Sequence, residues 1–162
     1  MKITWIGHSC FRIEQDGYAV VIDPYEDGSV QGCKPVREKA DAVLCSHEHG
    51  DHNARKVVTL SGAEGKSSPF TITKLETFHD DVKGAKRGRN TIHIITDGQT
   101  KIAHMGDLGC EPEPEQMTKL QGLDVMLIPV GGFFTIDAKQ AVDLVHKLAP
   151  KVDLRLRKEG VQ

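Results

Sequence analysis

The run His47-Glu48-His49-Gly50-Asp51-His52 follows directly on the apolar stretch Ala42-Val43-Leu44-Cys45. It places three histidines and an aspartate within six residues, at a point where a buried strand is expected to end. Imidazole nitrogens and carboxylate oxygens suit zinc and the neighbouring first-row metals. Because a loop that leaves a strand lets such side chains converge, the run predicts a metal site.

The spacing within the run assigns its side chains to two ions. In an extended chain, residues two apart point the same way, so His47 and His49 are predicted to bind one metal. Asp51 and His52 come just past the turn and are predicted to face a second metal nearby. The alternative is a solvated loop with an exposed histidine cluster. Such ligand spacing rarely arises without a metal, which favours the metal site.

Read as HxHxDH, the run resembles the signature of the metallo-β-lactamase superfamily of metal-dependent hydrolases. Other segments agree with this resemblance in chain order: KITWIGHSCFRIE at 2–14, YAVVIDP at 18–24, TFHDD at 77–81, RGRNTIHII at 87–95, KIAHMGDLG at 101–109 and LIPVGGFFTIDAKQAV at 127–142. Together they resemble a subgroup of Zn-dependent hydrolases that includes ascorbate-6-phosphate lactonase. The ordered set is more specific than any single piece of it.

The resemblance implies a two-metal site with the following ligands: His47, His49 and His79 for the first metal, Asp51 and His52 for the second, and Asp107 between the two. Asp51 is also the implied catalytic residue, because it would accept or relay a proton from the nucleophilic water. Zn²⁺ is the expected ion, with Mn²⁺ or Fe as alternatives, at one or two ions per chain.

Four further residues belong to the predicted pocket or its surroundings: His8, His104, Cys110 and Arg89. Each of these two histidines stands at the end of a predicted strand. It either lines the pocket, supports a ligand or makes a structural hydrogen bond. Cys110 stands where relatives often carry another histidine, and a thiolate also binds zinc. Arg89, close to Arg87, either binds an anionic substrate group or lies in a solvated turn.

Composition agrees with an intracellular enzyme of about one domain, since the chain has 162 residues and 38% of them are hydrophobic. The net charge of -2, from 21 basic and 23 acidic residues, gives no electrostatic case for nucleic acid or an anionic membrane as partner. The four cysteines are widely spaced, and no apolar run reads as a signal peptide or membrane span. We therefore expect a reduced, cytoplasmic protein that acts on a small molecule.

Periodicity divides the chain into a β-rich first part and strand–helix units after it. Strands are predicted over 2–6, 10–14, 19–22, 42–45, 70–75, 91–96, 101–104 and 124–130, and helices over 113–120 and 137–148. The stretch 54–60 reads as a short helix or a connector. This order predicts the α/β class, in agreement with the αβ/βα four-layer sandwich of the metallo-β-lactamase fold that the resemblance implies.

The sequence departs from the resemblance after residue 152. Relatives usually continue there with a strand that ends in a PMHY-like segment, whose histidine completes the second metal site. Here residues 153–162 read DLRLRKEGVQ, and no histidine follows His146. We therefore predict a domain over 1–152 that is incomplete at its C-terminal end, and a divergent charged tail over 153–162. A missing strand would expose a sheet edge, which predicts a homo-oligomer.

These features predict a hydrolase that uses a metal-bound hydroxide on an ester, lactone or phosphoester of a small molecule. The alternative is a degenerate domain of the same fold that binds metal without turnover. A nuclease of the same superfamily is disfavoured, because the chain has no basic surface excess.

Overall fold

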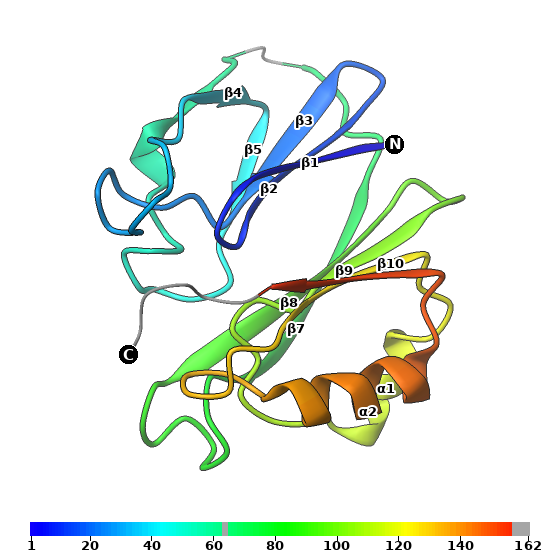
Figure 1. Ribbon diagram of the computed structural model, residues 1–162. Helices are drawn as coiled ribbons and strands as arrows, with labels where there is room; N and C mark the ends of the chain where they lie inside the picture. Colours follow the sequence, from blue (N-terminus) through cyan, green and yellow to red (C-terminus); the bar gives the residue numbers. More distant parts are fainter. Residues whose placement is uncertain (63–64, 157–162) are drawn as a thin grey trace. The chain divides into compact units, whose positions relative to one another are not determined.

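The computed structural model describes residues 1–62 and 65–156 (Figure 1). Contacts divide the described residues into two compact units, one over Met1–Pro69 and one that begins at Phe70. The contacts divide the chain between residues 69 and 70, and the single domain over 1–152 stays a prediction. In the described residues the first unit holds two sheets and the second unit one, and each unit has its own apolar core.

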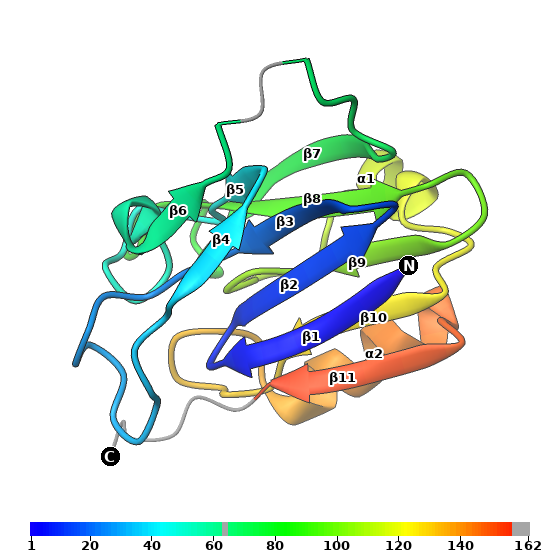
Figure 2. The ribbon, with the colours of Figure 1, turned by 90° about the horizontal axis from the view of Figure 1, so that it is seen from above.

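The first unit is built on a four-stranded sheet in the order β1-β2-β3-β5 (Figure 2). Its strands are β1 (Lys2–Gly7), β2 (Cys10–Gln15), β3 (Tyr18–Ile22) and β5 (Ala42–Leu44). The first three strands pair antiparallel, but β5 runs parallel to β3, with Leu44 opposite Ile22. Parallel pairing brings the carboxyl ends of β3 and β5 to one edge, so the residues that follow them lie side by side.

A second, two-stranded sheet completes this unit. It pairs β4 (Glu38–Ala40) with β6 (Val58–Leu60) in parallel. The stretch 54–60, predicted as a short helix or a connector, forms the 3-10 helix η1 (Arg55–Val57) followed by β6. The described part of this unit contains no α-helix. Both α-helices of the described residues lie in the second unit.

The second unit is a five-stranded sheet in the order β11-β10-β9-β8-β7. Its strands are β7 (Thr71–Phe78), β8 (Arg89–Thr96), β9 (Lys101–His104), β10 (Val125–Pro129) and β11 (Val152–Leu156). β7, β8 and β9 pair antiparallel, whereas β9, β10 and β11 pair in parallel. Parallel neighbours need crossovers, and α1 (Pro114–Lys119) and α2 (Ala138–Leu148) supply them on one face of the sheet (Figure 1).

The amphipathic pattern of α2 determines how it packs. Its N-cap, Asp137, accepts a hydrogen bond from the Gln140 backbone at 2.8 Å, which satisfies a donor that the first turn leaves free. Ala141, Leu144 and Leu148 are buried in the core of the sheet, and burial of a leucine contributes about 1.5–3 kcal/mol. The predicted helix over 137–148 is thereby confirmed. Neither of the two α-helices in the described residues is long and apolar enough to cross a bilayer.

Strand β11 corrects the sequence prediction at the C-terminal end. Residues 152–156 pair in parallel with β10, so the strand runs four residues past the predicted boundary at 152. Val152, Leu154 and Leu156 alternate with two charged residues in the period of a strand. The strand that the sequence analysis predicts to be missing after residue 152 is therefore present as far as residue 156. The rest of the predicted tail lies outside the described residues. Association through a sheet edge stays a prediction.

Candidate metal centre

Asp23 connects the two parallel strand ends of the first unit. It follows β3, is fully buried, and accepts hydrogen bonds from the Ser46 backbone N–H and hydroxyl, both at 2.6 Å. Its Oδ2 also lies 2.8 Å from Nδ1 of His52. Because an ionised carboxylate only accepts hydrogen bonds, Nδ1 of His52 carries a proton, and Nε2 of the neutral ring keeps the lone pair that binds a metal.

The same carboxylate orients His47 through Ser46. The Ser46 hydroxyl donates to Asp23, and its oxygen lies 2.9 Å from Nδ1 of His47. Since the hydroxyl hydrogen is used on Asp23, Nδ1 of His47 is the donor in the second contact. Nε2 of His47 is therefore also the ligand nitrogen. Sequence reasoning missed Asp23, although it stands in the quoted segment YAVVIDP, directly after a strand.

The His-rich run folds into a tight turn directly after β5, as predicted. The backbone N–H groups of His52 and Asn53 donate to the carbonyl of His49 at 2.8 and 3.0 Å. This turn brings the rings of the run close together: the ring centroids of His47 and His49 are 4.7 Å apart, and those of His47 and His52 are 4.2 Å apart. The structure thus brings all three histidines of the run together within the first unit.

His8 also lies beside these histidines in the first unit, in the turn between β1 and β2. Nε2 of His8 is 3.2 Å from Oδ2 of Asp51 and 3.2 Å from Nε2 of His52. The side chains of His8 and His52 are almost wholly covered, whereas that of Asp51 is 29% exposed. Among the pocket roles left open for His8, the structure therefore places it directly beside two predicted ligands.

The second unit brings together the other two predicted ligands. His79 follows β7, Asp107 follows β9, and Nε2 of His79 lies 3.1 Å from Oδ2 of Asp107. Gly109 makes this approach feasible, because a Cβ there would lie only 2.2 Å from the backbone nitrogen of Asp80. Its own N–H donates to the carbonyl of Phe78 at 2.9 Å. The GD turn is thereby held against the backbone that carries His79.

Asn90 fixes the backbone of Asp107 from the other side. Its buried side-chain oxygen accepts a hydrogen bond from the Asp107 N–H at 2.9 Å. Its amide donates to the carbonyl of Met105 and to the hydroxyl of Thr77, both at 3.0 Å. The structure thus uses Asn90, inside the second unit, to position a predicted ligand.

The loop 80–88 presents basic side chains near His79. The carboxylate of Asp80 accepts four backbone N–H bonds from the loop, at 2.7–3.0 Å. Burial alone would raise the pKa of Asp80, but these bonds, led by that of Arg87, lower it to about 2. The guanidinium of Arg87 lies 5.1 Å from the centre of the Phe134 ring. Both line a hollow that also includes His79, whereas Arg89 begins β8, is exposed and does not line it.

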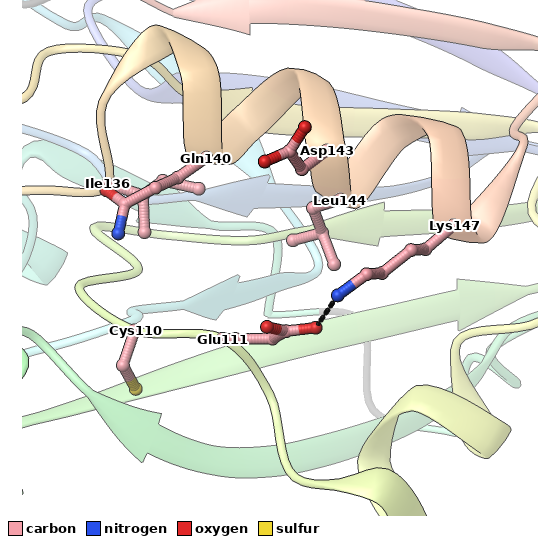
Figure 3. A pocket seen from close by; sticks show the side chains of 7 residues that line it. All are labelled: Cys110, Glu111, Ile136, Gln140, Asp143, Leu144 and Lys147. Carbon is pink, nitrogen blue, oxygen red and sulfur yellow. Dashed lines mark hydrogen bonds and ion pairs between the residues drawn. The ribbon is translucent and has the colours of Figure 1, made fainter.

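His104 and Cys110 have surroundings of their own in the second unit. His104 lies opposite His93 across β8 and β9, and its Nδ1 accepts a hydrogen bond from the Gly106 N–H at 3.2 Å. Cys110 lines a hollow beside α2, where Lys147 and Glu111 form an ion pair (Figure 3). Burial raises the pKa of the Cys110 thiol, which keeps it protonated near neutral pH.

The donor chemistry of the first unit fits a divalent metal. Imidazole nitrogens and carboxylate oxygens converge, and the ligand nitrogens of two imidazoles are set by hydrogen bonds to their other ring nitrogens. Such sets accept zinc, manganese or iron. The structure therefore defines an α/β protein with a candidate metal centre.

Comparison with known proteins identifies the family. Residues 2–154 match the Beta-lactamase superfamily domain, so the chain belongs to that family, and the predicted metallo-β-lactamase fold is confirmed.

The chain is 30% identical over 183 residues to a UPF0173 metal-dependent hydrolase of Hyperthermus butylicus, covering 93% of this chain and 80% of the relative. It is 31% identical over 176 residues to a UPF0173 protein of Pyrococcus furiosus, covering 94% and 80%. A Thermotoga maritima structure, described as a Zn-dependent hydrolase of the metallo-beta-lactamase superfamily, is 29% identical, with a TM-score of 0.75, and covers 99% of this chain and 78% of that one.

Proposed function

We propose that this chain hydrolyses an ester, lactone or phosphoester of a small molecule with the help of divalent metal ions, Zn²⁺ first among them. The observation that carries the proposal is the Asp23 network, which sets Nε2 as the ligand nitrogen in both His47 and His52. Relatives named as metal-dependent hydrolases support the class of reaction.

The proposed ligands follow the order of the family motifs: His47, His49 and His79 for the first metal, Asp51 and His52 for the second, and Asp107 shared by the two. The geometry within the first unit supports the roles of His47 and His52, and the His79–Asp107 pair supports those of the second unit. Because the proposed ligands come from both units, the test substitutes one ligand from each unit and measures the metal content.

A bound divalent ion lowers the pKa of water to near neutrality and polarises a substrate oxygen. The residues of the chain then have two tasks. Asp51 accepts the proton, for which a carboxylate that is partly open to solvent is suited. Asp23 keeps both histidine rings in the tautomer that binds, without touching the substrate itself.

The test is elemental analysis of the purified protein together with a hydrolysis assay. We expect close to two metal ions per chain, falling in His49→Ala and in Asp107→Asn. The matched control is His146→Ala, because His146 is exposed on α2 and should leave the metal content unchanged. Nitrophenyl esters, a simple lactone and a nitrophenyl phosphodiester serve as substrates, before and after chelation.

Hydrolysis that is lost with a chelator and restored by Zn²⁺ would support the proposal. One metal or none per chain, with no turnover of any of the three substrate types, would favour the alternative of a domain that keeps the fold without the activity.

A further inference from the structure

The turn that carries His8 is held in an uncommon backbone conformation. His8 has a φ of 51°, in the left-handed region that non-glycine residues rarely adopt. The Trp5 indole donates to the His8 carbonyl at 2.9 Å. At the preceding Gly7, whose φ is 156°, a Cβ would lie 2.8 Å from the Tyr25 hydroxyl. Strain of this kind is often kept where a side chain has to reach a defined place.

The place that His8 reaches is the predicted second metal site. Its Nε2 lies 3.2 Å from Oδ2 of Asp51 and 3.2 Å from Nε2 of His52, and the third side of this triangle, from His52 to Asp51, is 3.4 Å. The three residues offer one ligand atom each, and all three belong to the first unit.

A single hydrogen bond does not account for this triangle. Nε2 of His8 carries at most one proton, yet it faces two acceptor atoms at equal distances. Nε2 of His52 presents a lone pair, because the ring proton is on Nδ1 toward Asp23. It faces a carboxylate oxygen at 3.4 Å, and two electron-rich atoms come this close most favourably with a cation between them.

A tetrahedral metal shell matches the three distances. Zinc binds imidazole nitrogen and carboxylate oxygen at about 2.0–2.2 Å, so two ligand atoms of one tetrahedron are separated by about 3.3–3.5 Å. The observed sides of 3.2, 3.2 and 3.4 Å are within about 0.1 Å of this range, so the three atoms match one face of such a tetrahedron. The fourth position is left for a ligand from elsewhere.

We propose that His8 is a direct ligand of the second metal ion, together with Asp51 and His52. The inference rests on the proposed function in so far as that function needs a second metal. It adds a protein ligand outside the HxHxDH run, supplied by the first hairpin of the chain.

Zinc titration of the full chain tests this, with His8→Gly as the main variant. Glycine adopts a φ of 51° without strain, so the turn should keep its shape. We expect wild type to bind two Zn²⁺ ions and His8→Gly to bind the second at least about ten-fold more weakly, as for other changes around a metal ligand. His146→Ala is the matched control and should titrate like wild type, and circular dichroism and melting curves check folding.

Imidazole rescue separates a ligand from a structural residue. In Co²⁺-loaded His8→Gly, added imidazole should restore the wild-type visible spectrum in a saturable way, because that spectrum reports the ligands of the ion. It should leave the spectra of wild type and of His146→Ala unchanged. If His8→Gly fails to fold, His8→Asn replaces it, since asparagine also tolerates the left-handed region.

Two failures are distinguishable. Fewer than two Zn²⁺ ions on wild type would overturn the two-metal site of the proposed function and this inference with it. Two ions on wild type, with the second bound equally tightly by the folded His8 variant, would overturn this inference alone. A weaker second ion whose cobalt spectrum does not respond to imidazole would also reject direct ligation.

Discussion

Nδ1 of His52 lies 2.8 Å from Oδ2 of Asp23, and this contact determines which nitrogen of the ring is left for a metal. The two residues are 29 positions apart in the chain. They meet because β3 and β5 run parallel and end at the same edge of the sheet. The parallel pairing of β3 with β5 thus determines which ring nitrogen of His52 is available to a metal.

Asp23→Asn should weaken zinc binding by about 10- to 100-fold, because the amide no longer fixes the tautomer of either histidine. It should also destabilise the fold by about 1–3 kcal/mol. Asparagine has a single acceptor oxygen, whereas Asp23 accepts hydrogen bonds on both of its carboxylate oxygens. Zinc affinity by competition with a chelating dye and urea unfolding measure the two effects. Asp16→Asn, in an exposed turn, is the control, and equal zinc affinity in the two variants would contradict the assigned role.

Gly109→Ala should destabilise the second unit by about 1–3 kcal/mol, as overpacking of a tight site does. The added Cβ would lie 2.2 Å from the Asp80 nitrogen and 2.3 Å from the His79 carbonyl carbon, so backbone has to move. Metal content should fall as well, because His79 moves away from Asp107. Gly50→Ala controls for the change of residue type, since a Cβ there makes only ordinary contacts at 3.7 Å. Equal urea midpoints for the two variants would reject the steric argument.

Local patterns were sufficient to predict part of the site. The apolar stretch before His47 predicted a strand, and the structure has β5 followed by the turn. The helix over 137–148 was predictable for the same reason, because its apolar spacing and its Asp137 cap are properties of neighbouring residues.

Other parts depend on contacts between residues far apart in the chain. Asp23 and Asn90 act through partners that only strand pairing brings near, so a single sequence does not show which residues they contact. The link from His8 to Asp51 spans 43 positions. β11 was overlooked for another reason: Asp153 and Arg155 made its alternating pattern look like a charged tail, although each apolar position is in the period of a strand.

The stability of the first unit should fall in acid through Asp41. Hydrogen bonds from the Ser61 hydroxyl and the Ala19 N–H lower its pKa from 3.8 to about 2. A lowered pKa means that the carboxylate stabilises the folded state fully above about pH 4, and that this contribution is lost as the pH falls toward 2. Urea unfolding at pH 5 and pH 3 should therefore show a larger drop for wild type than for Asp41→Asn. Asp143→Asn, exposed on α2, should behave as wild type does, and parallel pH profiles for all three proteins would exclude Asp41 as the cause.

Removal of divalent metal should lower the thermal stability of the protein in a reversible way. Ligands such as His47 and His52 are gathered only in the folded chain, so bound metal stabilises that state by about 2.7 kcal/mol when free metal is at 100 times its dissociation constant. A strong chelator should therefore lower the melting temperature of wild type and of His146→Ala, and added Zn²⁺ should restore it. His47→Ala should start lower and respond less to either addition, because part of the binding energy is already lost. A melting temperature of wild type that is the same with chelator and with Zn²⁺ would show that these side chains do not hold metal in the folded protein.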